Sequence, residues 1–368
     1  MIKRRIRAAA IQASPVFLDK KATIEKFCSL IEEAGREGAE FIVTPETGIP
    51  GYPYWRGSFG YTDPESAALW REAVIDYYEQ SLHVERDTRP LCLAARSADA
   101  HCVIGCSEQD DRPGSRPLFN TMLFIGRDGR ILGRPRKLIP THQERIFWGM
   151  GDASDLRVFE TDIGRIGGLV CFENHVTLFK AAMAIKGEEI HAANWPGYWT
   201  YAGERRNVRD MSGAHGPYHL CDQDSAVREY AFETQTFVVS ASLIQPPETV
   251  PDSFPFKARA NFRWAIGGSS IVNPFGMYLV EPVLGEETII YADLDLDDRT
   301  VAKNVFDCMG HYARWDVVSL NLREEGWGPL RSGEPGRLPI SEDRLEEIAR
   351  KHNIPPKTIE AILRECGA

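Results

Sequence analysis

The pattern of hydrophobic and polar positions divides the chain into alternating strand-like and helix-like segments. Residues 6–13 form a short apolar run that indicates a first strand. Residues 22–39 have apolar side chains at helical spacing, which predicts an amphipathic helix. Its apolar face contains Ile24, Phe27, Leu30, Ile31 and Ala34. The sequence FIVTPE then predicts a short buried strand that ends at Glu46.

The same alternation continues through most of the chain. Two segments, 121–138 and 156–171, favour hairpins with turns at Asp128–Gly129 and Ile163–Gly164. The remaining expected helices are 64–85, a segment after Pro90, 177–188 and 225–236, and the remaining expected strands are 102–108, 189–195, 237–243, 269–282 and 287–297. Helices between strands predict an α/β fold, and the hairpins predict mixed sheets.

Composition and charge narrow the function classes. The 368 residues are 43% hydrophobic and 26% charged, as in globular proteins, and the chain could hold one large or two ordinary domains. The net charge of −10 and the absence of a basic block exclude nucleic acid as an expected partner. No apolar run reaches the length of a membrane span. Eight scattered cysteines favour a reduced, cytoplasmic protein without disulfides.

One domain, residues 1–320, is expected, followed by a C-terminal linker and short helical assembly tail, residues 321–368. After Asn321 the chain becomes rich in Gly and Pro, as in a linker, and residues 341–368 predict two short helices separated at Pro355–Pro356. Their charges are balanced, so an assembly tail is favoured over a DNA-binding helix-turn-helix. Two long irregular segments, 196–222 and 245–263, predict functional loops or interfaces.

Three reactive side chains stand where predicted strands or hairpins end: Glu46, Lys137 and Cys171. Each alone has an ordinary explanation, because a Glu or Lys after a strand is usually solvated and a Cys is often buried core. Together they form a coherent site. A thiol is a good nucleophile only as the thiolate, so Glu46 could take its proton and Lys137 could stabilise negative charge. The backbone N–H of Phe172 could add an oxyanion donor.

Four motifs give this site a family resemblance. TPETGIPGYPYW, RKLIPTHQERIFWGMGD, GGLVCFENH and HAANWPGYW occur in the order and spacing of the nitrilase branch of the carbon-nitrogen hydrolase superfamily. GHYARWDV, which begins at Gly310, resembles a late motif of that branch. The resemblance covers roughly residues 5–320.

The resemblance implies a four-layer αββα sandwich that forms homodimers and often longer spirals. It implies that Glu46 is the general base, Lys137 the stabilising cation and Cys171 the nucleophile. Glu144 matches a second glutamate that positions substrate and supports the lysine, and Glu173 matches an acid with a structural role. No metal or organic cofactor is implied.

The chain also departs from the family pattern. Phe172 stands where nitrilases usually have Trp, and His175–Val176–Thr177 replaces a common Tyr-Met-Pro-like run. Both changes leave the catalytic set intact but affect the expected substrate choice. The candidate substrate-binding residues are aromatic side chains beside the site, although such clusters more often belong to a core or an interface: Tyr52, Tyr54, Trp55, Phe172 and Trp195.

These residues predict an enzyme that hydrolyses a small organic nitrile to the carboxylic acid and ammonia through a cysteine thioimidate and thioester. The alternatives are an amidase of the same superfamily, hydration of the nitrile to the amide, and a non-catalytic assembly scaffold. The scaffold is disfavoured because it would have no need for Glu46, Lys137 and Cys171 together.

Overall fold

The computed structural model describes residues 4–58, 63–112, 114, 116–197, 199–201, 222–258, 263–324, 351, 355 and 358. Residues 1–326 form one compact unit, which is the part described below. Its strands are β1 (Arg5–Gln12), β2 (Phe41–Val43), β3 (His101–Gln109), β4 (Leu118–Ile125), β5 (Ile131–Gly133), β6 (Trp148–Gly149), β7 (Val158–Thr161), β8 (Gly164–Val170), β9 (Ile190–Trp195), β10 (Trp199–Tyr201), β11 (Phe237–Ser242), β12 (Ile244–Gln245), β13 (Arg263–Val272), β14 (Tyr278–Leu284) and β15 (Thr288–Asp295). Its α-helices are α1 (Lys20–Arg36), α2 (Pro64–Gln80), α3 (Val84–Asp87), α4 (Arg89–Ser97), α5 (Thr177–Ile185), α6 (Asp222–Thr234) and α7 (Asp297–Val305).

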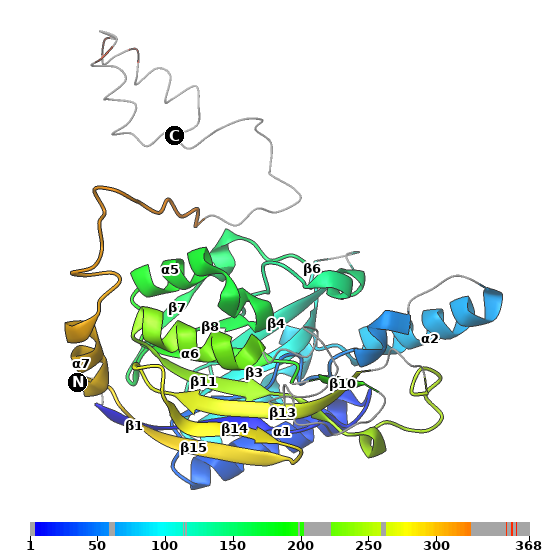
Figure 1. Ribbon diagram of the computed structural model, residues 1–368. Coiled ribbons are helices and arrows are strands. Elements are labelled where there is room, and N and C mark those ends of the chain that lie inside the picture. Colours follow the sequence, from blue (N-terminus) through cyan, green and yellow to red (C-terminus); the bar gives the residue numbers. More distant parts are fainter. Residues whose placement is uncertain are drawn as a thin grey trace, which may run out of the picture. The chain divides into compact units, whose positions relative to one another are not determined.

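The strands form two mixed sheets. The first sheet has the order β15-β1-β2-β3-β4-β5, and the second has the order β10-β13-β11-β9-β8-β7. β1, β2 and β3 are parallel, as are β8, β9 and β11, whereas the hairpin partners are antiparallel. The two sheets pack face to face, and α5 and α6 cover the outer face of the second (Figure 1). With α1 and α4 on the first sheet, this is the predicted αββα sandwich.

Strand β1 shows why the layers form. Ile6, Ala8 and Ala10 face the core between the sheets, whereas Ala9 and Ile11 face the core beneath the helices. A strand buried on both faces reads as a continuous apolar run because its side chains alternate between two hydrophobic environments. Helix α1 packs on the second of these cores through the predicted apolar face, with Leu30 only partly buried.

The structure differs from the predicted elements in a few places. The segment 269–282 is not one strand, because the Asn273 side chain accepts the N–H groups of Phe275 and Met277 and reverses the chain between β13 and β14. The helix expected over 64–85 ends at Gln80, and α7 was not predicted. The two tail helices and most of the loop 196–222 lie outside the described residues. Within the described ranges, no helix combines the length and apolarity needed to cross a membrane.

The two sheets are tied together at the edge where β2 and β9 end. Asn194 Nδ2 donates to the carbonyl oxygen of Thr44 (2.7 Å), and the Thr44 hydroxyl accepts the N–H of Gly105 (3.0 Å). Gly105 has no room for a side chain, since a Cβ atom there would lie 1.9 Å from the Pro45 carbonyl oxygen. The loop that follows β2 is therefore held at this edge by both sheets.

Candidate active site

Glu46, Lys137 and Glu144 form a buried charge cluster at this edge. Lys137 Nζ lies 2.9 Å from Glu46 Oε1 and 2.7 Å from Glu144 Oε2, and all three side chains are at most 1% exposed. Glu46 follows β2, Lys137 follows the β4–β5 hairpin, and Glu144 lies in a 3-10 turn (His142–Ile146). The sequence-predicted residues thus meet, although 91 positions separate Glu46 from Lys137.

Asn120 and Tyr52 donate further hydrogen bonds to this cluster. Asn120 Nδ2 donates to Glu46 Oε1 (2.6 Å), and the Tyr52 hydroxyl donates to Glu144 Oε1 (2.6 Å). The Lys137 backbone N–H donates to the Asn120 carbonyl oxygen (2.7 Å), which places the lysine beside β4. Glu46 Oε2 has no hydrogen-bond partner among the described residues. That oxygen remains as an acceptor for a proton or a water molecule.

Burial and charge set the ionisation of the two carboxyl groups in different ways. Burial raises the pKa of Glu46 to about 7, although Lys137 opposes the rise. Burial also works to raise the pKa of Glu144, but Lys137 and the hydrogen bonds from Tyr52 and Thr141 leave it below its ordinary value. Burial would lower the pKa of Lys137, yet the two carboxylates hold it well above its ordinary value. Glu144 therefore stays ionised near neutral pH, whereas Glu46 can gain and lose a proton there.

Cys171 occupies a sharp turn directly after β8. Its φ of +53° lies in the left-handed region, which is uncommon for a non-glycine residue. A 3-10 turn, Cys171–His175, begins there and leads into α5. The negative charge of a Cys171 thiolate would contribute to the raised pKa of Lys137, so the two groups belong to one electrostatic site.

Glu173 joins the Cys171 turn to the Lys137 segment. One carboxyl oxygen accepts the N–H of Leu138 (2.6 Å), and the other accepts the N–H of Val170 (3.0 Å). Burial raises the pKa of Glu173 to about 7, against the effect of Lys137. These two bonds connect the residues that adjoin the nucleophile and the cation, and they fit the structural role that the family resemblance implies for Glu173.

The five aromatic candidates lie in different environments. Tyr52 binds Glu144 as described, and the Tyr54 hydroxyl donates to the Pro196 carbonyl oxygen (2.5 Å). Trp195 is buried at the end of β9, and its indole N–H has no hydrogen-bond partner among the described residues. Phe172 is 40% exposed. Trp55 is stacked on Phe256 and surrounded by Trp70, Tyr77, Phe147 and Phe254, so packing accounts for it.

Asn120 was not among the predicted site residues. A polar amide inside the apolar run LFNTMLFI was the feature that could have identified it, because a buried Asn needs hydrogen-bond partners. The sequence did not show that its partner would be Glu46, which comes from a different strand of the sheet.

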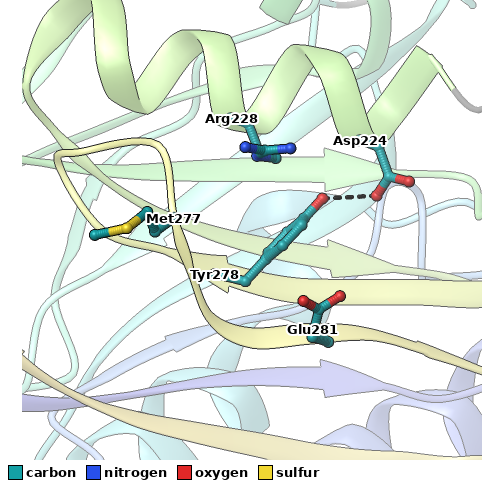
Figure 2. A pocket seen from close by; sticks show the side chains of 5 residues that line it. All are labelled: Asp224, Arg228, Met277, Tyr278 and Glu281. Atoms are coloured by element: carbon teal, nitrogen blue, oxygen red, sulfur yellow. Dashed lines mark hydrogen bonds between the residues drawn. The ribbon is translucent and has the colours of Figure 1, made fainter.

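A separate open pocket lies between α6 and the β13–β14 hairpin. Figure 2 shows the Tyr278 hydroxyl directed at Asp224, to which it donates a hydrogen bond of 2.7 Å. Arg228, Met277 and Glu281 line the rest of the pocket. None of the predicted site residues lies in its lining.

Comparison with known proteins agrees with this fold. The carbon-nitrogen hydrolase family model matches residues 7–304. An aliphatic nitrilase from Rhodococcus rhodochrous is 38% identical over 333 residues, covering 89% of this chain and 85% of the relative. A bifunctional nitrilase/nitrile hydratase (NIT4A) from Lupinus angustifolius is 36% identical, covering 88% of each chain. A carbon-nitrogen hydrolase from Helicobacter pylori G27 has the same fold, with a TM-score of 0.62, 20% identity and coverage of 82% of this chain and 93% of that one.

The chain therefore belongs to the carbon-nitrogen hydrolase family. Within that family it is a member of the nitrilase branch, and it is a hydrolase that acts on carbon–nitrogen bonds.

We predict that Cys171 is the cysteine that iodoacetamide modifies fastest. Burial raises the pKa of Cys28 to about 11 and also raises the pKa values of Cys102 and Cys106, which keeps these thiols protonated. Cys171 has Lys137 nearby to favour the thiolate. Peptide mapping of labelled protein at neutral pH should find the fast phase on Cys171.

Cys171→Ala should fold normally, lose this fast phase and lose enzymatic activity by several orders of magnitude. Cys106→Ala is the matched control and should retain both. A fast phase that survives in Cys171→Ala, or full activity of that variant, would refute the assignment.

Proposed function

We propose that this chain hydrolyses a small organic nitrile to the carboxylic acid and ammonia through a covalent bond to Cys171. The observation that carries the proposal is the buried Glu46–Lys137–Glu144 cluster beside a cysteine on a strained turn. This arrangement provides a base, a cation and a nucleophile at one edge of the sandwich. The names of the relatives, an aliphatic nitrilase and a bifunctional nitrilase/nitrile hydratase, support nitriles as the substrate class.

The first half of the reaction forms the covalent intermediate. Glu46 takes the proton from Cys171 Sγ, and the thiolate attacks the nitrile carbon. The nitrile nitrogen receives a proton from Glu46, which gives a neutral thioimidate. Lys137 and the backbone N–H of Phe172 stabilise the negative charge that develops on this nitrogen during the attack.

The second half releases ammonia and the acid. Glu46 activates a water molecule that adds to the thioimidate, and the protonated nitrogen of the tetrahedral intermediate leaves as ammonia. A second water attacks the resulting thioester, the acid leaves, and the Cys171 thiol is restored. The two steps together consume two water molecules for each nitrile, and no metal or organic cofactor takes part in the proposed steps.

The tetrahedral intermediate determines the product. Loss of ammonia leads to the acid, whereas loss of the thiol would release the amide. A cation and two carboxylates around the nitrogen favour its protonation and therefore the acid. Phe172, which follows Cys171 directly in the sequence and stands in place of the usual Trp, is consistent with some amide as a by-product.

Matched nitriles and amides, both aliphatic and aromatic, test this proposal. We expect higher kcat/KM for the nitriles and the acid as the major product, with ammonia and products measured together. Cys171→Ala provides the blank for each substrate. A higher kcat/KM for amides across the panel would identify an amidase instead, and amide as the dominant nitrile product would identify a hydratase.

We also propose that the chain works as a homodimer or a larger homo-oligomer, in the cytoplasm, with no nucleic-acid or membrane partner. The apolar side chains at least 51% exposed on α5, α6, α7 and the segment that follows include Leu178, Phe232, Val305, Tyr312 and Trp315. A second copy would remove these side chains from water.

Truncation after residue 325 should shift the size distribution of the oligomers in sedimentation while preserving the fold. A fully active monomer of the whole chain would contradict the proposal.

A further inference from the structure

Four buried polar side chains form a continuous hydrogen-bonded chain behind the Cys171 turn. Asn174 lies in that turn, His191 lies on β9, Glu188 lies just before β9, and Tyr230 lies on α6. Each is at most 1% exposed. The proposed reaction assigns none of them a step. Buried polar groups are costly unless they are paired, so their arrangement calls for an explanation.

Asn174 holds the two backbone groups that flank the nucleophile. Its Nδ2 atom donates to the carbonyl oxygens of Leu169 (3.1 Å) and Cys171 (2.9 Å). Because carbonyl oxygens only accept hydrogen bonds, these contacts fix the orientation of the amide. The Asn174 Oδ1 atom then faces His191 Nε2 at 2.8 Å.

The protonation of His191 follows from this orientation. Oδ1 of Asn174 is an acceptor, so Nε2 of His191 must carry a hydrogen. The other ring nitrogen, Nδ1, lies 2.9 Å from Glu188 Oε1, and that contact also needs one proton between the two atoms. The hydroxyl of Tyr230 donates to the second oxygen of Glu188, and its ring stacks on the His191 ring at 3.8 Å. All the hydrogen bonds of this chain can thus form at the same time.

Gly167, four residues before the nucleophile, makes room for this chain. A Cβ atom on Gly167 would lie 2.3 Å from Glu188 Oε1, so a side chain there would displace the carboxyl group. Gly167 is also the partner of His191 in the register between β8 and β9. The absence of a side chain at Gly167 therefore leaves space for the Glu188 carboxyl group.

We propose that His191 is a positioning residue that acts through Asn174 to hold Cys171 in its left-handed conformation. A non-glycine residue keeps such a conformation only where its surroundings enforce it. Asn174 donates hydrogen bonds to the backbone on both sides of the turn. Its orientation is held by His191, which is in turn held by Glu188 and Tyr230. This inference rests on the proposed role of Cys171 as nucleophile.

His191→Ala should lower kcat by roughly tenfold to a hundredfold with little change in KM, because small displacements of a reacting atom carry penalties of that order. The rate at which iodoacetamide modifies Cys171 should fall as well. His101→Ala is the matched control. His101 is also buried, and its ring lies 2.7 Å from the Asp162 carboxylate. It stands at the start of β3, away from the edge of the sheet that carries the site. This variant should leave kcat and the alkylation rate unchanged even where it lowers stability.

A second pair of variants separates the effect of hydrogen bonding at position 188 from the effect of filling the same space with an apolar side chain. Glu188→Gln can donate to His191 Nδ1 and accept from Tyr230, so it should retain activity, whereas Glu188→Leu should behave like His191→Ala. This pair decides the question if His191→Ala does not fold. Equal behaviour of the Gln and Leu variants, or His191→Ala with unchanged kcat and alkylation rate, would overturn the proposal. The alkylation rate needs no nitrile turnover, so it still tests the positioning role if the proposed reaction is wrong.

Discussion

One buried ammonium group between two carboxylates is the interaction on which this site depends. Removing a carboxylate from water is expensive, and an attractive partner in good geometry must offset that cost. Lys137 serves Glu46 and Glu144 at once, at 2.9 and 2.7 Å. The two acids nevertheless differ, because Tyr52 and the Thr141 N–H stabilise the Glu144 anion, whereas one Glu46 oxygen has no partner in the described part of the chain. Lys137 thus pairs with one carboxylate that stays ionised near neutral pH, Glu144, and with one that can titrate there, Glu46.

The sandwich explains why such distant residues can meet. Parallel strands deliver their carboxyl ends to one edge of a sheet, and in this fold β2 and β8 belong to different sheets that face each other. Asn194 joins the edges by its bond to the Thr44 carbonyl, and Glu173 joins the Cys171 turn to the segment after Lys137. The reactive groups are therefore held by backbone contacts from both sheets, which is the rigidity that a preorganised site needs.

Much of this could be predicted from the sequence, because the information was local. The apolar alternation identified most strands and helices, and the strand ends identified Glu46, Lys137 and Cys171. What the sequence could not give were the partners set by tertiary packing. Nothing near Trp55 showed that Phe256 would stack on it, and nothing near Asn120 named Glu46 as its acceptor. The proposed role of His191 likewise depends on its contacts with Asn174, Glu188 and Tyr230.

The most direct test of the central interaction is the stability of Lys137→Met as a function of pH. Without the cation, the folded-state pKa values of Glu46 and Glu144 rise above their unfolded values, so folding binds protons and stability falls as pH rises. Urea denaturation should show a loss of about 3–5 kcal/mol at pH 8. The loss should shrink toward pH 5. Lys180→Met is the control, since the Glu233 partner of that buried lysine is 41% exposed and can rehydrate. A difference from wild type that is small, or that stays constant between pH 5 and 8, would contradict the account.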